Sequence, residues 1–254
     1  MANPVAPSIT QSGRLEPFDL QVARNQVFGH RPIFRAAYTT VATTGQNYLV
    51  WNRTAAYVFP TVAAQMTLSS SSAGDTTQAV LIQGLDASYN EISEVLVLNG
   101  QNGVLSTKSY LRINGMVVLV DSPAGDLYFG TGTVTAGVPA NVYGFIHAGD
   151  NTMMAAIYTV PAGYTLYVQG GSVSSGTSGQ NKYVTVDFYS VIGGVKYLGA
   201  KITQANGFQH YPYTPPISVP EKTDLYDTAT TTDTTPAQVS ANLSGILIKN
   251  DGAL

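Results

Sequence analysis

The three histidines are the side chains of this sequence with the widest chemical range, because imidazole can ligate a metal or move a proton near neutral pH. His30, His147 and His210 lie far apart, and none stands in a ligand spacing such as HExxH or HxH. The chain has no cysteine, which excludes thiol catalysis, disulfides and Cys-ligated metals. We therefore expect no metal site and no cofactor.

The other patterns that could support catalysis or ligand binding are incomplete. Asp86–Glu91 offers oxygen ligands at intervals usable by Ca²⁺ but lacks the DxDxDG order, so turn capping is the simpler explanation. The Gly-rich segments Gly130–Thr133 and Gly170–Ser172 precede no expected helix that could hold a phosphate. Asp187 and Asp224 could act as a glycosidase pair only if the fold joined them. With no GxSxG elbow either, we expect that the protein is not an enzyme.

Arginine is concentrated near the start of the chain. The first 53 residues carry five of the six arginines and two acidic residues, a net charge of +3, whereas the remainder carries seven basic and thirteen acidic residues. A basic, Pro-bearing segment on an acidic body is typical of a tether that docks on an acidic surface, the alternative being a solvated tail without a role. We expect the interface to include Arg14, Arg24, Arg31 and Arg35. The acidic body argues against nucleic acid as a partner.

Sixteen tyrosines form the largest aromatic group. On the expected strands they could form a sugar-stacking platform or a protein interface. We favour the interface, since the tyrosines are spread over many strands, and we include Tyr183 and Tyr189 in it. The tyrosines concerned are Tyr128, Tyr143, Tyr158, Tyr164, Tyr167, Tyr183, Tyr189 and Tyr197.

The overall composition favours an assembling β protein. Charged residues make up 11 % of the chain, against about 25 % in ordinary globular proteins. A surface this poor in charge is commonly covered by partners, and we expect a homo-oligomer, with a trimer as the preferred state. No apolar run approaches the roughly 20 residues of a membrane helix, and residues 1–10 lack the features of a signal peptide. We expect no membrane contact and no Sec export.

The segment Leu81–Gly100 is the clearest supersecondary pattern. It reads as two strands joined by a turn at Asp86–Asn90, with Gly84 available for a positive φ. In the second strand both faces carry apolar residues, which predicts a strand covered on each side. A hairpin alone is unstable in water, so a sandwich partner is required.

Short strand candidates at close spacing continue through the rest of the chain, as in β-sandwiches and barrels. We predict an all-β fold: an extended N-terminal arm over residues 1–36, a first β-sandwich domain over 37–150 and a second, jelly-roll-like domain over 151–254. The candidates are Asn47–Trp51, Ala56–Phe59, Ala63–Leu68, Ala79–Leu85, Glu91–Leu98, Tyr110–Asn114, Met116–Val120, Leu127–Phe129, Val142–Ile146, Ala155–Val160, Tyr164–Val168, Lys182–Val191, Val195–Ala200, Phe208–Tyr213, Ile217–Val219, Lys222–Ala229 and Gln238–Ile248.

Several segments together resemble a family of virion structural proteins of tailed bacteriophages, notably phages of cyanobacteria and other aquatic bacteria. They are Phe18–His30, Gly84–Gly100, Tyr110–Gly115, Ala155–Val168 and Pro220–Leu225, in the same order over most of the chain. The resemblance implies a part of the particle, and capsid cement or decoration proteins of such phages are typically β-sandwich trimers with extended arms.

On this basis we expect a non-enzymatic cement protein that binds and stabilises the major capsid protein shell. It would be assembled in the host cytoplasm and lie on the capsid surface of the virion. The alternatives are a tail component, such as an adaptor, tail-tube-associated or fibre-attachment protein that contacts neighbouring tail proteins, and a carbohydrate-binding host-attachment module.

Overall fold

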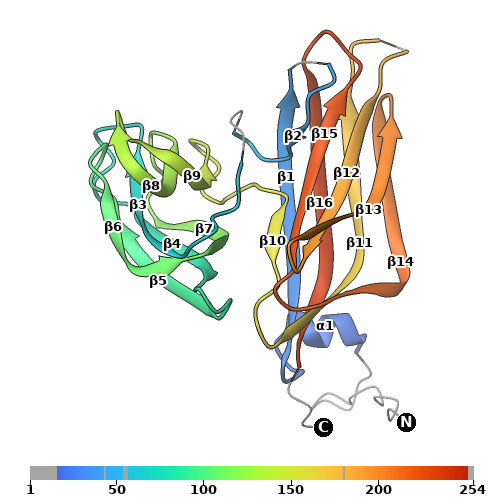
Figure 1. Cartoon of the computed structure of the whole chain (residues 1–254), viewed down its shortest axis with the longest axis horizontal. Coiled ribbons are helices and arrows are strands. Elements are labelled where there is room, and N and C mark those ends of the chain that lie inside the picture. The colour runs from blue at the N-terminus through green and yellow to red at the C-terminus, as the bar shows by residue number, and fades with distance from the viewer. Residues whose placement is uncertain (1–15, 43, 54–56, 180, 251–254) are drawn as a thin grey trace.

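A computed structural model of the chain describes residues 16–42, 44–53, 57–179 and 181–250, which form two β lobes side by side (Figure 1). The larger, which we call the sandwich lobe, packs two antiparallel sheets face to face. The first sheet has the order β1 (His30–Val41), β16 (Ala237–Lys249), β11 (Tyr164–Gly176), β14 (Gly207–Val219). The second has the order β10 (Ile157–Thr159), β15 (Asp224–Thr231), β12 (Val184–Ile192), β13 (Val195–Gln204), and β2 (Tyr48–Leu49) also pairs with β15.

The smaller lobe, which we call the inserted lobe, comprises residues 62–153. Its core is built around Met66, Ile82, Tyr110 and Phe129, all fully buried. One sheet has the order β6 (Val104–Tyr110), β3 (Ala64–Ser70), β8 (Leu127–Thr135), β9 (Val138–Ile146). The other has the order β5 (Glu91–Val97), β4 (Ala79–Leu85), β7 (Arg112–Val120).

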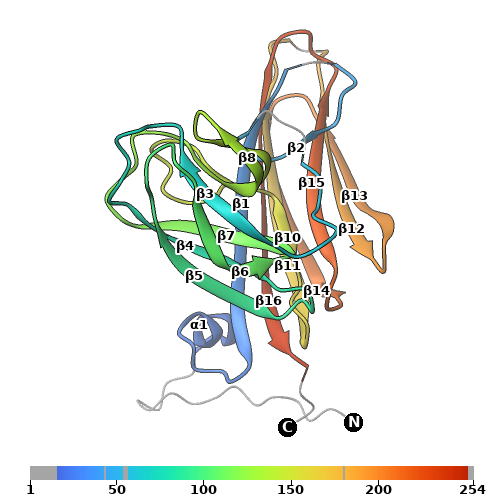
Figure 2. The same cartoon turned by 60° about the vertical axis from the view of Figure 1, so that its left-hand side comes forward.

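The prediction of an all-β fold is confirmed, with one short helix, α1 (Phe18–Ala23), in the described chain. Figure 2 shows α1 beside the first residues of β1 at one end of the sandwich lobe. No helix among the described residues is long and apolar enough to span a membrane.

The division of the chain into lobes differs from the expected one, which was an N-terminal arm followed by two consecutive domains. β1 starts inside the expected arm and pairs with β16 along its whole length, from His30 opposite Ile248 to Val41 opposite Ala237. Residues 30–41 are therefore part of the sandwich lobe, and residues 37–51 do not belong with the inserted lobe. The chain leaves the sandwich lobe after Trp51 and returns at Ala155, and an isolated β-bridge joins these two residues. The inserted lobe is therefore an insertion into the sandwich lobe, between β2 and β10.

The hairpin at residues 79–97 has the expected turn but a different environment. Asp86 Oδ1 accepts hydrogen bonds from the backbone N–H of Ser88 and Asn90, at 2.8 and 2.9 Å, as the turn chemistry predicts. Gly84 is not at a positive φ; it lies within β4, where a Cβ would be 2.7 Å from the Tyr110 ring. The prediction that the second strand is covered on both faces is wrong, because β5 is an edge strand and Val95 is 51 % exposed.

Candidate functional site

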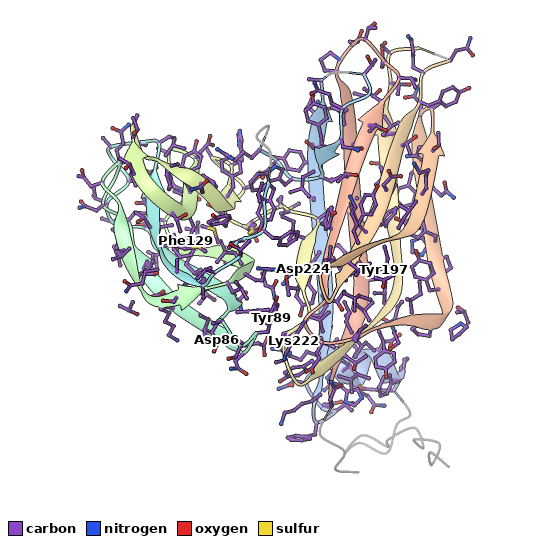
Figure 3. The ribbon with its side chains drawn as sticks, viewed as in Figure 1. Asp86, Tyr89, Phe129, Tyr197, Lys222 and Asp224 are labelled. Atoms are coloured by element: carbon purple, nitrogen blue, oxygen red, sulfur yellow. The ribbon has the colours of Figure 1, made fainter. Side chains whose placement is uncertain are left out.

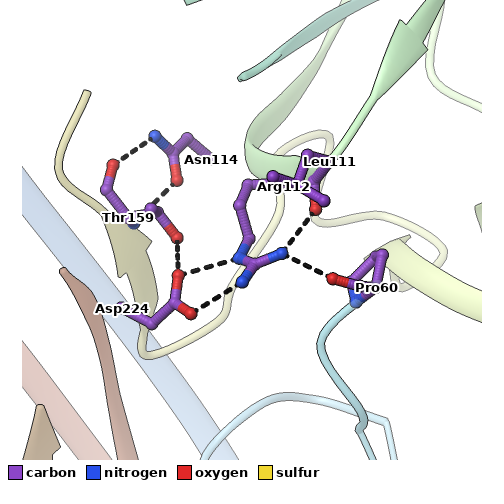
Figure 4. A network of polar contacts seen from close by, with 6 residues as sticks. All are labelled: Pro60, Leu111, Arg112, Asn114, Thr159 and Asp224. Carbon is purple, nitrogen blue, oxygen red and sulfur yellow. Dashed lines mark hydrogen bonds and ion pairs between the residues drawn. The ribbon is translucent and has the colours of Figure 1, made fainter. Parts of the chain in front are cut away.

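The two lobes are joined by a buried ion pair (Figure 4). Arg112, at the start of β7, donates from Nε and Nη2 to the two carboxylate oxygens of Asp224, at the start of β15, over 2.8 and 2.9 Å. Its Nη1 donates to the carbonyl oxygens of Pro60 and Leu111. Both charged residues are less than 9 % exposed. A bidentate contact of this kind fixes the orientation of the two side chains as well as their distance.

Neighbouring polar groups complete this contact. Thr159 Oγ1 donates to Asp224 Oδ1 over 2.6 Å, and the backbone of Thr159 exchanges two hydrogen bonds with the side-chain amide of Asn114. The guanidinium of Arg112 also lies 5.0 Å from the ring centre of Phe59 and 5.7 Å from that of Tyr89. Figure 3 labels Asp224, Tyr89 and Lys222 on the two sides of this junction. The carboxylate of Asp224 is therefore fully occupied by structural contacts.

A second contact between the lobes uses Asp150, the single charged residue between Leu127 and Asn181. Its Oδ2 accepts hydrogen bonds from the Tyr38 hydroxyl at 2.9 Å and from the Asn52 side-chain amide at 2.7 Å. An apolar cluster that includes Trp51 and Phe145 lies at the same junction, with the two ring centres 6.3 Å apart. Apolar burial, an ion pair and hydrogen bonds thus hold the lobes in one arrangement.

Between the lobes lies a cleft of about 400 Å³, which we call the inter-lobe cleft. The residues lining it from the sandwich lobe are Arg31, Pro32, Ile33, Phe34, Arg35 and Tyr158, and those from the inserted lobe are Gln83, Gly84, Glu91, Ile92, Ser93 and Asn114.

The structure places two of the predicted interface arginines, Arg31 and Arg35, in this cleft. Arg31 Nη2 pairs with Glu91 Oε1 across the cleft at 2.6 Å, and its guanidinium lies 5.1 Å from the ring centre of Tyr164. Burial opposes the charge of Arg31, but the contacts with Glu91 raise its pKa overall.

Arg35 differs from Arg31 because no carboxylate of the described chain pairs with it. Its guanidinium lies 5.1 Å from the ring centre of Tyr158, its Nη1 donates to the carbonyl oxygen of Phe34 at 3.3 Å, and its Nε has no partner. Burial lowers its pKa, although an arginine stays charged at any ordinary pH. A charged guanidinium with free donors in a cleft can bind a carboxylate or another oxyanion.

The other two arginines of the prediction are not brought into the cleft. Arg14 lies outside the described residues. Arg24 follows α1 and pairs with Glu16.

The two tyrosines of the predicted interface do not form one surface. Tyr183 precedes β12 and is 43 % exposed. Tyr189 lies on β12, where its ring stacks on Tyr226 at 5.4 Å and the Lys196 ammonium lies 3.5 Å from its centre. These contacts cover the ring surface that a sugar would need, so the arrangement does not favour a stacking platform at Tyr189.

The residues considered for catalysis or metal binding remain separate. Asp187 pairs with Lys201 at 3.1 Å and Asp224 with Arg112, so each carboxylate has its own cation. His30, near α1, and His147, after β9, each contact a nearby backbone carbonyl through Nδ1, while His210 is exposed on β14. Within the described ranges, no three His, Cys, Asp or Glu side chains gather as metal ligands.

Arg112 is a site residue that the sequence did not single out, whereas Tyr158 was among the expected interface tyrosines and Glu91 was considered only as part of the turn Asp86–Glu91. Arg112 carried a usable signal: it is the single arginine beyond residue 53 and stands between the apolar residues Leu111 and Ile113. A charge inside an apolar strand requires a buried partner. Nothing local indicated that the partner would be Asp224.

No known family model matches the sequence, and no curated protein matches it. Among solved structures, infectious bursal disease virus Gx strain aligns with 16 % identity over 88 % of this chain and 73 % of that chain, at a TM-score of 0.26. The VP2 subviral particle of the same virus aligns with 11 % identity over 88 % and 73 % of the two chains, at a TM-score of 0.24. At TM-scores this low the likeness carries no argument about the fold or the function of this chain.

Proposed function

We propose that this protein is a virion structural protein, a capsid cement protein of a tailed bacteriophage that binds the shell of the major capsid protein. The resemblance of five sequence segments to such proteins supports a place in the particle. The observation that carries the mode of binding is the inter-lobe cleft, where the half-buried guanidinium of Arg35 has no anionic partner within the described chain.

In this proposal the cleft seats an acidic segment of the capsid protein. A carboxylate of that segment pairs with Arg35, while Arg31 and Glu91 form the opposite wall. The buried ion pair between Arg112 and Asp224 keeps both walls at a fixed separation, so that little freedom is lost on binding.

Shell stabilisation would then come from area and copy number, without a reaction. A specific contact buries about 1,600 Å² in total, and many copies acting on one shell add through avidity. Exposed apolar side chains on the edge strands β13 and β14 would serve contacts between copies of this chain in a trimer. They are Val195, Tyr197, Leu198, Phe208 and Ile217, and Figure 3 marks Tyr197 on the sandwich lobe.

The test is binding to capsid shells stripped of this protein, measured by sedimentation. Arg35→Gln should reduce occupancy at least about tenfold, because a charged hydrogen bond contributes roughly 1.5–3 kcal/mol. Ser93→Glu, which places a competing carboxylate on the exposed cleft wall, should also reduce it. Arg24→Gln removes the same charge outside the cleft and should bind as the parent does.

Equal binding of the parent, Arg35→Gln and Ser93→Glu would overturn the cleft as the docking site. A deletion that tests the basic segment separately must stop before α1, because the ring of Phe18 in α1 packs on that of His30, the first residue of β1. Copy number in purified virions then separates head from tail: on the order of hundreds supports a cement protein, whereas about six or twelve would place the protein in the tail.

A further inference from the structure

The sandwich lobe contains a second cavity, of about 130 Å³, away from the inter-lobe cleft. It lies between the two sheets and is lined from both edge strands, by Gly199 and Ala200 of β13 and by Tyr211, Tyr213 and Ile217 of β14. A cavity of about 150 Å³ in another protein holds benzene, so this one has room for a ligand of roughly five non-hydrogen atoms.

Irregular strand pairing makes room for the cavity. Val168 of β11 pairs with Ile217 of β14 and Gly170 pairs with Pro212, so that Gln169 alone faces residues 213–216. A β-bulge of this kind bends its strand away from the ladder. Gly171 provides further room, because a Cβ there would lie 3.1 Å from the Tyr211 ring.

Two buried polar groups line this mostly apolar cavity without partners. Asp227 of β15 is 8 % exposed, and no hydrogen bond or ion pair reaches its carboxylate from the described chain. The hydroxyl of Tyr211 is buried and has no partner either. A native fold rarely leaves a buried carboxyl group unsatisfied, because desolvation without compensation is costly.

Aromatic rings stand beside these groups. Phe188 of β12 pairs laterally with Asp227, and its ring centre is 5.6 Å from that of Tyr211. The ring of Tyr213 follows at 6.0 Å from Tyr211. Aromatic faces attract cations, and a carboxylate adds a full negative charge to the same place.

The charged and titratable groups around Asp227 supply no counter-ion. From β14 it faces Tyr211 and Tyr213, and burial raises the pKa of each hydroxyl. On β1, Arg35 lines a void of about 20 Å³ together with Asp227 but directs its guanidinium over Tyr158. Burial, with no opposing cation, raises the pKa of Asp227 to about 8.

We propose that the cavity lined by Asp227, Tyr211 and Phe188 binds an alkylammonium group, from a small free amine or from a lysine side chain. The ammonium would donate to the Asp227 carboxylate and the Tyr211 hydroxyl, and its alkyl part would fill the apolar remainder. Below about pH 8 the empty site holds a neutral carboxyl group, so that each cation bound releases one proton to solvent.

The proposal is tested by calorimetry on the full chain with n-butylammonium, with 1-butanol and butyrate as neutral and anionic analogues of the same length. We expect the cation to bind best and its affinity to fall about tenfold for each pH unit below about 8. Titration at pH 7 in buffers of different ionisation enthalpy should count the released proton. A second arm uses a lysine blocked at both backbone ends: its binding identifies a lysine side chain as a possible occupant, and binding of butylammonium alone identifies a free amine.

Asp227→Asn should weaken butylammonium binding more than about tenfold and abolish its pH dependence. Tyr211→Phe should weaken it less, since one neutral hydrogen bond is lost. Asp187→Asn, a buried carboxylate on the neighbouring strand that already pairs with Lys201, is the matched control and should bind normally. The proposal is overturned if 1-butanol binds as well as the cation, if Asp227→Asn keeps full affinity, or if none of the ligands binds.

Discussion

Arg112 and Asp224 are 112 positions apart in the sequence and form the most buried ion pair of the described chain. Removing one partner leaves the other charged, buried and unpaired, which typically costs about 3–5 kcal/mol. We expect Asp224→Asn to lower the free energy of unfolding by this amount, and the pair Arg112→Met with Asp224→Leu to cost less than the sum of the single changes. Urea unfolding measures both.

The control for this prediction is Glu91→Gln, the same acid-to-amide change in an ion pair between the lobes whose two side chains are 43 % and 39 % exposed. We expect it to change stability by less than about 1 kcal/mol. If Asp224→Asn cost no more than Glu91→Gln, the buried ion pair would not be what holds the lobes together.

Asp227 predicts an unusual dependence of stability on pH. Its folded-state pKa, about 8, lies above the unfolded value of about 4, so the folded state holds a proton that the unfolded state has lost. The contribution of Asp227 to stability is therefore present below about pH 4 and is lost as the pH rises toward 8, at up to about 1.4 kcal/mol per unit. In urea unfolding, the free energy of unfolding of the parent should fall steadily from pH 5 to pH 8 relative to that of Asp227→Asn. If the two proteins showed the same dependence of unfolding free energy on pH, this prediction would be contradicted.

At the scale of residues, the sequence predicted chemistry that depends on near neighbours. Asp86 caps its turn as expected, since the backbone N–H groups that donate to its carboxylate are within four positions. Arg31 and Arg35 were selected from charge distribution, and the cleft that contains them became visible only with the fold. No local sequence pattern marks Asp227, because the absence of a partner for its carboxylate depends on how strands that are distant in sequence pack around it.

At the scale of elements, the sequence predicts most strands with clear alternation but neither β1 nor β6. The candidate Ala79–Leu85 coincides with β4, whereas β1 contains Pro32 and two arginines that obscure its period. The alternation is present at its other end, where Ala37, Thr39 and Val41 are buried. A proline fits there because β1 is the edge of its sheet, where an N–H can be absent.

Gly84 provides a test at this scale, since its role lies in strand packing and not in the turn. A Cβ at this position would collide with the carbonyl of Arg112 and lie 2.7 Å from the Tyr110 ring. We expect Gly84→Ala to separate β4 from β7 and to lower the free energy of unfolding by roughly 2–4 kcal/mol in urea, because the cost of overpacking adds to the cost of separating the strands. Gly176→Ala, which meets no atom within 4 Å, should be nearly neutral; an equal cost of both changes would argue against close strand approach as the reason for Gly84.

At the scale of the whole molecule, the insertion could not be predicted, because it depends on pairing between the two ends of the chain. Thr39 faces Val239, and about 200 residues separate them. Closure of a loop that long leaves no mark on composition or periodicity near either strand. The predicted domain boundary at residue 150 lies near a real transition, because the chain returns to the sandwich lobe at the bridge between Trp51 and Ala155.

This topology predicts which fragments fold. A fragment of residues 151–254 lacks β1 and β2 and therefore loses Ala37, Val41 and Val50 from its core, so we expect no cooperative thermal unfolding by circular dichroism. Residues 62–153 keep their whole core and should unfold cooperatively. Residues 16–51 joined to 155–250 by a short Gly-Ser linker should also fold, since the bridge between Trp51 and Ala155 brings the cut ends together. Cooperative unfolding of 151–254 alone would show that β1 is dispensable and that the two lobes are consecutive domains after all.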